Sequence, residues 1–259
     1  MIKNNYLKNK MSKGQPVLGM WNTLGSPMAA EVLAHTGLDF LIIDFEHGPF
    51  QLDLVQDYVS RCELHNCTPI VRIPANADWM ALQALDQGVH GIMIPHVDDY
   101  ASAKKIVNYV KYFPQGKRGY TPFSKAGGFT NLGKENYAAQ ANDFTIISII
   151  IESQEGLNNL DEILKIKEID VVYFGAYDLS QALGVPGNVK HASVIKTMKE
   201  GVRKVVSAGK YAGGFVAQSE KDVKWLLDMG MNFITYDVDS SVLFKPINKL
   251  QQWFKEETK

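Results

Sequence analysis

The sequence contains few cysteines and no long apolar run. Only two of its 259 residues are cysteine, which is too few for a disulfide framework. No stretch approaches the roughly 18 apolar residues that a membrane-spanning helix needs. The chain begins with MIKNNYLKNKMSKG, which lacks the apolar core of a signal peptide. We therefore expect a soluble, reduced, cytoplasmic protein.

The sequence also lacks an excess of charge of either sign. Its 27 Lys and Arg residues nearly balance its 28 Asp and Glu residues, for a net charge of −1. No basic patch stands out, so nucleic acids and anionic membranes are poor candidates for partners. The composition, 46% hydrophobic and 21% charged, is ordinary for a globular chain. Its length suits one large α/β domain or two small ones.

What the sequence does contain is a regular alternation of strand-like and helix-like segments. The helix-like segments have apolar residues at helical spacing, at 52–65, 101–110, 160–166, 192–209 and 220–230. The strand-like runs are rich in Val, Ile and Phe without polar alternation, which is typical of parallel strands covered on both faces. They lie at 16–20, 40–44, 68–73, 91–95, 145–151, 171–175, 211–216 and 233–237.

Eight strands that alternate with helices over about 250 residues predict a (β/α)8 barrel. An open doubly wound sheet is the alternative, but GMWNTLGSP after the first strand does not match its G-x-G-x-x-G fingerprint. We predict one barrel domain over residues 1–259, with a polar N-terminal extension at 1–13. Within the long connection at 113–144, the loop 116–130 is either a lid, in which Arg118 and Lys125 close over an anionic substrate, or a subunit contact.

Ionisable residues collect where the predicted strands end. In a parallel barrel these ends meet on one rim, where active sites form. An ionisable group costs several kcal/mol to bury unpaired, so such a cluster indicates a site. The residues are Asp44, Glu46, His47, Arg72, His96, Glu152, Asp178 and Asp237.

Three groups of these residues suggest chemistry, each with a structural alternative. Glu152 and Asp178 follow adjacent strands, so their carboxylates would repel each other. A cation such as Mg²⁺ or Mn²⁺ between them would remove the repulsion. The structural alternative is that each carboxylate caps the helix that follows it. Asp44 could orient the His47 imidazole as a general base, or the local backbone could satisfy the histidine. Arg72 could bind a carboxylate or an oxyanion, or form a salt bridge with these acids.

The order of motifs resembles one enzyme family. The stretches LIIDFEHGP, VRIP, GIMIPHV, GKRGY, IIIES and FGAYDLS together resemble the HpcH/HpaI aldolases, which are metal-dependent pyruvate aldolases. The resemblance covers residues 14 to 250. It implies a (β/α)8 TIM barrel of the phosphoenolpyruvate/pyruvate-domain type. It also implies a homo-oligomer, commonly a hexamer, in which the C-terminal helix packs on a neighbouring subunit.

The resemblance assigns roles to the rim residues. It implies that Glu152 and Asp178 hold a divalent metal ion (Mg²⁺, Mn²⁺ or Co²⁺). It implies that His47, held by Asp44, serves the acid/base step through a water. Arg72 would bind the pyruvate carbonyl oxygen and steady the enolate. A Schiff-base mechanism would need a lysine inside the barrel, and no predicted strand carries one.

By the same resemblance, backbone amides at Gly175, Ala176 and Tyr177 would lie against the pyruvate carboxylate. The sequence departs from the family pattern near this site. Ile150 stands where many members have Gln, and Ala176-Tyr177 stands where many have Pro-Ala. We expect both changes to affect which aldehyde is accepted.

The predicted function is therefore a class II aldolase, a carbon–carbon lyase that cleaves or forms 4-hydroxy-2-oxoacids from pyruvate and an aldehyde. Two alternatives remain. The first is a lyase of CoA thioesters from the citrate-lyase-like branch, which would need a nucleotide-binding surface. The second is a non-catalytic barrel scaffold, which would have no reason to gather on one rim the five residues Asp44, His47, Arg72, Glu152 and Asp178.

Overall fold

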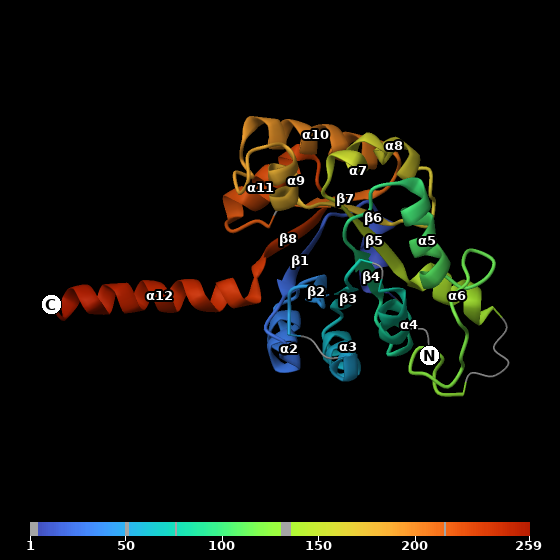
Figure 1. The fold of residues 1–259 in the computed structure, drawn as a ribbon. Helices are drawn as coiled ribbons and strands as arrows, with labels where there is room; N and C mark the ends of the chain where they lie inside the picture. The colour runs from blue at the N-terminus through green and yellow to red at the C-terminus, as the bar shows by residue number, and fades with distance from the viewer. Residues whose placement is uncertain (1–4, 50–51, 76, 131–135, 215) are drawn as a thin grey trace.

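The computed structural model describes residues 5–49, 52–75, 77–130, 136–214 and 216–259. Its eight parallel strands pair in chain order and close into a barrel, which confirms the predicted fold class over an open sheet (Figure 1). The strands are β1 (Val17–Asn22), β2 (Phe40–Asp44), β3 (Thr68–Arg72), β4 (Gly91–Ile94), β5 (Ile146–Ile151), β6 (Val171–Phe174), β7 (Tyr211–Gly214) and β8 (Phe233–Val238).

The continuous apolar runs follow from burial on both faces of each strand. In β2, Phe40 and Ile42 belong to the cluster that fills the barrel interior. Leu41 and Ile43 belong to the larger cluster between the strands and the surrounding helices. Successive side chains of a strand point to opposite faces, so a strand covered on both faces has no polar positions to alternate with.

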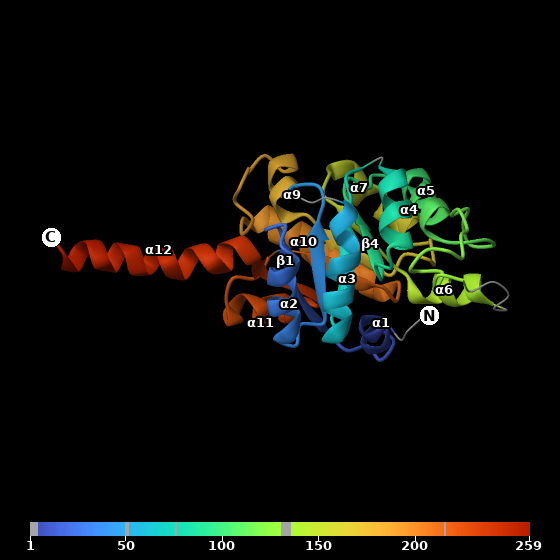
Figure 2. The ribbon, with the colours of Figure 1, turned by 90° about the horizontal axis from the view of Figure 1, so that it is seen from below.

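Helices surround the barrel, and α12 projects away from it (Figures 1 and 2). No described helix is both long and apolar enough to cross a membrane. The helices are α1 (Tyr6–Met11), α2 (Pro27–His35), α3 (Val55–Leu64, after a 3₁₀ turn at Leu52–Leu54), α4 (Asp78–Asp86), α5 (Tyr100–Val110), α6 (Tyr137–Phe144), α7 (Gln154–Asn158), α8 (Leu160–Ile163), α9 (Ala176–Ala182), α10 (Ala192–Ser207), α11 (Glu220–Met229) and α12 (Asp239–Glu257).

The expected polar extension contributes to the core instead of lying outside it. Residues 1–4 are outside the described residues, but α1 places Leu7 and Met11 in the interior cluster of the barrel. The Asn5 side chain caps α1 and donates to the Phe144 carbonyl (2.8 Å). The Tyr211 hydroxyl donates to the Met11 carbonyl (2.8 Å). Helix α1 therefore closes the end of the barrel where the strands begin.

The long connection before β5 does not place its two cations over the strand ends. Arg118 is buried and donates to Asp86 (2.7 Å) at the end of α4. Lys125 donates to the Ser60 hydroxyl (2.9 Å) on α3. Both cations therefore hold the connection to the flank of the barrel, so the expectation of a lid with these side chains facing the substrate is wrong for this chain. Residues 131–135 of the connection lie outside the described residues.

The burial of Leu7 makes a prediction about stability. Its side chain is fully buried, so Leu7→Ala should lower the free energy of unfolding by about 2–5 kcal/mol, through lost apolar burial and a cavity. Chemical denaturation would measure the change. The matched control is Leu64→Ala, whose side chain is 72% exposed and should cost no more than about 0.5 kcal/mol. Equal stabilities of the two variants would show that α1 does not belong to the core.

Candidate active site

A cavity of about 310 Å³ opens among the carboxyl ends of the strands. Its wall includes every residue to which the family resemblance gave a role, contributed by or following strands β2, β3, β5 and β6. Three other residues expected on the rim, Glu46, His96 and Asp237, do not line it. This arrangement agrees with the rule that barrel active sites form where the strands end. The predicted residues on the wall are Asp44, His47, Arg72, Glu152, Gly175, Ala176, Tyr177 and Asp178.

Asp44 and Arg72 form a buried ion pair on this wall. The register of β2 and β3 places the two residues opposite each other. Arg72 donates from Nε to Asp44 Oδ1 (2.8 Å) and from Nη2 to Oδ2 (2.5 Å). Asp44 is only 2% exposed, and Oδ1 also accepts the backbone N–H groups of Glu46 (3.0 Å) and His47 (3.3 Å). The carboxylate thus has four protein donors, which offset the cost of burying its charge.

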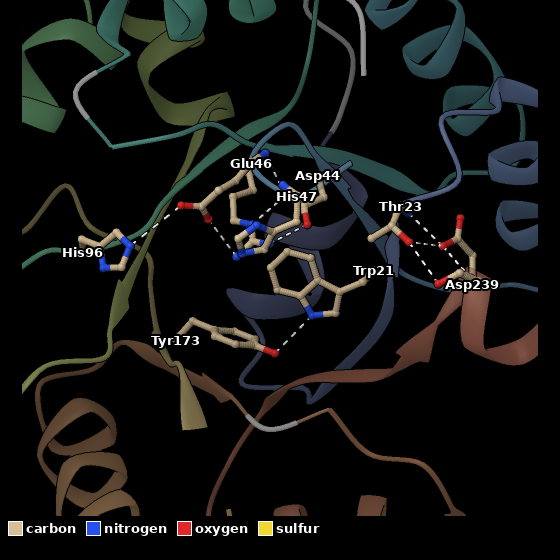
Figure 3. A network of polar contacts seen from close by, with 10 residues as sticks. Trp21, Thr23, Asp44, Glu46, His47, His96, Tyr173 and Asp239 are labelled. Atoms are coloured by element: carbon tan, nitrogen blue, oxygen red, sulfur yellow. Dashed lines mark hydrogen bonds and ion pairs between the residues drawn. The ribbon is translucent and has the colours of Figure 1, made fainter. Parts of the chain in front are cut away.

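These bonds change the expected role of Asp44. Among the described residues, no hydrogen bond joins its carboxylate to the His47 imidazole, because the guanidinium and two backbone amides already occupy its oxygens. Asp44 instead fixes the turn that carries His47. The imidazole itself is exposed at the cavity wall, within reach of water or substrate. Figure 3 shows Asp44, Glu46 and His47 gathered on one side of the Trp21 ring.

Arg72 is held on three sides. Besides Asp44, its Nη1 lies 3.0 Å from Glu46 Oε2, and its guanidinium carbon lies 4.5 Å from the centre of the Trp21 ring. Trp21 is itself fixed, because its indole N–H donates to the Tyr173 hydroxyl (3.3 Å; Figure 3). The structure thus bears out the salt-bridge alternative for Arg72. It also keeps the guanidinium on the cavity wall, in a position that needs no rearrangement to meet a ligand.

Glu152 lies directly after β5 and is 7% exposed. Its Oε1 accepts the backbone N–H of His96 (2.8 Å) and lies 3.0 Å from His96 Nδ1. Burial raises the pKa of Glu152 above its usual range, the bonds from His96 lower it, and the carboxylates of Asp178 and Glu46 raise it again. The structure therefore concentrates acidic groups on one side of the cavity.

This acidic side fits a hard divalent cation. Glu152 and Asp178 both line the cavity and repel each other, and a cation between them would remove that repulsion. Carboxylate oxygens are the donors that Mg²⁺ and Mn²⁺ prefer. Among the described residues there is no group of three or more His, Cys, Asp or Glu placed to hold a metal. The remaining coordination positions would thus be open to water and substrate, as in a catalytic site.

The turn into α9 corrects one predicted substrate contact. The Gly175 N–H donates to the Ile151 carbonyl (3.1 Å), so this amide is already used within the barrel. The amides of Ala176 and Tyr177 lie in the first turn of α9, where N–H groups have no partner within the helix. Gly175 has another function, because a Cβ at this position would lie 2.5 Å from Glu152 Oε2.

Asp237, the acid expected on the rim at the end of β8, is not part of the site. Asp237 pairs with Lys245 (2.7 Å) and does not line the cavity. Asp239 accepts bonds from the Thr23 N–H (2.8 Å) and hydroxyl (2.9 Å) and from the Leu24 N–H (3.1 Å; Figure 3). It therefore fixes the loop after β1, from which Thr23 reaches the cavity. Only the three-dimensional structure distinguishes the two acids.

Comparison with known proteins agrees with this geometry. A family model described as HpcH/HpaI aldolase/citrate lyase matches residues 17–246. The chain belongs to this family. It is 33% identical to a 2-keto-3-deoxy-L-rhamnonate aldolase of Escherichia coli (strain K12), over 98% of this chain and 94% of that protein. It is 30% identical to a hydroxypyruvate/pyruvate aldolase of Roseobacter denitrificans, over 92% of this chain and 93% of that protein.

Among solved structures, an HpcH/HpaI aldolase/citrate lyase family protein from Burkholderia cenocepacia J2315 superposes with a TM-score of 0.90. The two are 28% identical, over 97% of this chain and all of that one. The predicted family and the predicted class of enzyme, a carbon–carbon lyase, are confirmed. The alternative of a non-catalytic scaffold is therefore dropped. Class II aldolases of this family use a divalent metal ion.

The close approach of Gly175 to Glu152 predicts an effect on this HpcH/HpaI site. Gly175→Ala should displace the Glu152 carboxylate and weaken Mn²⁺ binding by about 10- to 100-fold, as for other changes beside metal ligands. Titration calorimetry would measure the affinity. The control is Gly119→Ala, whose added Cβ would meet nothing closer than 4.0 Å. Unchanged Mn²⁺ affinity in Gly175→Ala would show that Glu152 is not a ligand.

Proposed function

We propose that the chain is a divalent-metal-dependent aldolase that cleaves and forms 4-hydroxy-2-oxoacids, with pyruvate as the product common to its substrates. One observation carries the proposal. A fixed guanidinium and an exposed imidazole share a small cavity with two carboxylates that repel each other. These are the groups that aldol cleavage needs, namely a stabiliser for the enolate, a base, and a holder for a cation.

In the proposed site, Glu152 and Asp178 hold the cation, which is Mg²⁺, Mn²⁺ or Co²⁺. When bound, the cation supplies Lewis acidity to the 2-keto oxygen of the substrate and lowers the cost of negative charge there. The protein groups supply the rest. The first-turn amides of α9 at Ala176 and Tyr177 face the substrate carboxylate.

The proposed chemistry starts at the 4-hydroxyl of the substrate. His47 accepts the hydroxyl proton through a water, the C3–C4 bond breaks, and its electron pair passes into the pyruvate enolate while the aldehyde leaves. The enolate oxygen faces Arg72. An arginine has five N–H donors, and the ion pairs with Asp44 and Glu46 use three of them, so two remain for the substrate. A proton then returns to C3, which gives pyruvate.

Because Arg72 has N–H donors left over, it can both form the salt bridge and bind the substrate. The salt bridge holds the guanidinium in place, and the free N–H groups act on the substrate. The thioester-lyase alternative has less support. Arg72 is the only Lys or Arg among the described residues of the cavity wall, whereas a CoA ester brings several phosphate charges.

A coupled assay for pyruvate tests the proposal. With 4-hydroxy-2-oxoacids as substrates and lactate dehydrogenase to detect pyruvate, EDTA should abolish turnover and Mn²⁺ or Mg²⁺ should restore it. Glu152→Ala and Asp178→Ala should each lower kcat/KM on the order of a thousandfold, because each removes a ligand of the cation that stabilises the developing charge. The control is Asp161→Ala, an exposed aspartate that pairs with Lys204 on the outer surface.

Two results would contradict the proposal. Turnover by metal-stripped protein that resists EDTA would exclude the cation, and the absence of pyruvate from every hydroxy-oxoacid would exclude the aldol reaction.

We also propose that α12 packs on a second copy of this chain. The helix projects from the barrel (Figure 1), and only its first residue is buried. An apolar stripe with no cover in the monomer is typical of an interface. The stripe is spaced four, three and four residues apart and each side chain is at least half exposed, at Leu243, Ile247, Leu250 and Phe254.

Charges on this stripe should break the assembly. Ile247→Glu combined with Leu250→Glu should lower the molar mass found by light scattering after size-exclusion chromatography, since buried carboxylates without partners are costly. Asn248→Glu combined with Gln252→Glu adds the same charge to the opposite face of α12 and should leave the mass unchanged. A wild-type protein that is monomeric at micromolar concentration would refute the assembly.

A further inference from the structure

The wall of the active cavity is divided into two chemically different sectors. The ionisable residues of the wall all come from β2, β3, β5 and β6 or from the turns that follow them. The remaining sector is formed by β7, β8 and β1, which are consecutive in the closed barrel. Its described side chains on the cavity are Val216, Val238, Trp21 and Thr23. We call these four residues the apolar sector.

The polar atoms of the apolar sector are already bonded within the protein. The Trp21 N–H donates to the Tyr173 hydroxyl (3.3 Å), and this hydroxyl is bonded to Thr235 Oγ1 (2.8 Å). The Thr23 hydroxyl donates to Asp239 (2.9 Å). The N–H of Trp21 and the O–H of Thr23 are thus both used, and only the Thr23 oxygen could still accept a bond from a substrate hydroxyl. A hydroxyl placed against Trp21, Val216 or Val238 would remain unpaired, and an unpaired buried hydroxyl is costly.

The charged sector has no Lys or Arg without an acidic partner to bind a second carboxylate. Arg72 is the only Lys or Arg on the described wall, and it is paired with two acids. Glu152 and Asp178 bring negative charge to the same cavity. In the proposed enzyme the bound cation balances that charge, so a carboxylate on the aldehyde would meet neither a net opposite charge nor a Lys or Arg without an acidic partner, and its burial would be costly. Ile150 of β5 also lines the cavity with an apolar side chain, which is only 2% exposed.

We infer that the aldehyde handled by this enzyme is uncharged and apolar, and that its carbon chain lies against Trp21, Val216 and Val238. The inference rests on the proposed aldolase function. In the condensing direction, the pyruvate methyl group loses a proton to His47 through a water, and the resulting enolate carbon bonds to the aldehyde carbon. The aldehyde oxygen then takes up a proton delivered from His47. The product is a 4-hydroxy-2-oxoacid with an apolar tail.

The apolar sector sets how strongly kcat/KM should depend on the size and polarity of the aldehyde. Each methylene group buried against an apolar wall should raise kcat/KM by about fourfold. An apolar wall discriminates only moderately against an added hydroxyl group, by about a hundredfold at most. A carboxylate without a partner should be rejected more strongly than a hydroxyl.

The test measures kcat/KM for condensation with pyruvate over aldehydes of graded size and polarity. The rate should rise from acetaldehyde to propanal to butanal. Glyceraldehyde should be about 10- to 100-fold poorer than butanal, and succinic semialdehyde, which has four carbons and a carboxylate, poorer still. An enzyme that takes glyceraldehyde or succinic semialdehyde as well as butanal would overturn the inference.

A second measurement separates this inference from the function on which it rests. Exchange of the pyruvate methyl protons in D₂O with Mg²⁺, followed by NMR, reports enolate formation without any aldehyde. Exchange together with a preference for charged or hydroxylated aldehydes refutes the apolar sector and leaves the aldolase proposal standing. No exchange and no condensation with any aldehyde refutes both.

A variant tests the wall itself. Val238→Thr keeps the shape of the side chain and adds a hydroxyl, so it should lower the ratio of kcat/KM for butanal to that for glyceraldehyde by about fivefold or more. A ratio within one protein is insensitive to loss of folded enzyme. The matched control, Val206→Thr, changes a 44% exposed residue of α10 and should keep the wild-type ratio. A ratio unchanged in Val238→Thr would place the aldehyde elsewhere.

Discussion

The buried carboxylate of Asp44 is the group on which the active cavity depends. Four donors surround it, two from the guanidinium of Arg72 and two from the backbone that follows β2. Without them a charge only 2% exposed would cost several kcal/mol. The same bonds pair the ends of β2 and β3, fix the guanidinium on the wall, and shape the turn that presents His47. The need to compensate the buried Asp44 charge thus positions both the Arg72 guanidinium and the turn that carries His47.

The acidic side of the cavity differs from the Asp44–Arg72 ion pair, because its carboxylates repel and destabilise one another. Glu152 is buried beside Asp178 and Glu46. Its burial is the main cause of its raised pKa, and the two neighbouring carboxylates raise the pKa further. Such a cluster costs stability while it holds no cation, and a ligand that binds only the folded state recovers that stability. Gly175 allows the cluster to be compact, since any side chain at this position would enter the space of the Glu152 carboxylate. In the proposed enzyme, the stability that the chain gives up here is the source of the affinity for a cation.

The barrel could be predicted from the sequence because each strand is buried on both faces and therefore appears as an unbroken apolar run. The rim residues followed from the same rule, since parallel strands bring their carboxyl ends together. The partners of those residues could not be predicted. Asp44 could bond to the side chain of His47, three positions away, or to that of Arg72 on the next strand. Only the β2–β3 register, which places Arg72 opposite Asp44, decides which of the two is its partner. Likewise Leu7 lies in a polar segment, and its burial depends on the barrel end that it closes.

Asp239 shows how one residue can link the cavity to the rest of the molecule. It is the first residue of α12, and it is 4% exposed. Its carboxylate holds the loop after β1, including the Thr23 hydroxyl that lines the cavity. Beyond it, α12 leaves the barrel as a helix of 19 residues. The same carboxylate therefore joins the buried start of α12 to the loop that carries Thr23 on the cavity wall, so the exposed part of the helix and the cavity share one fixed point.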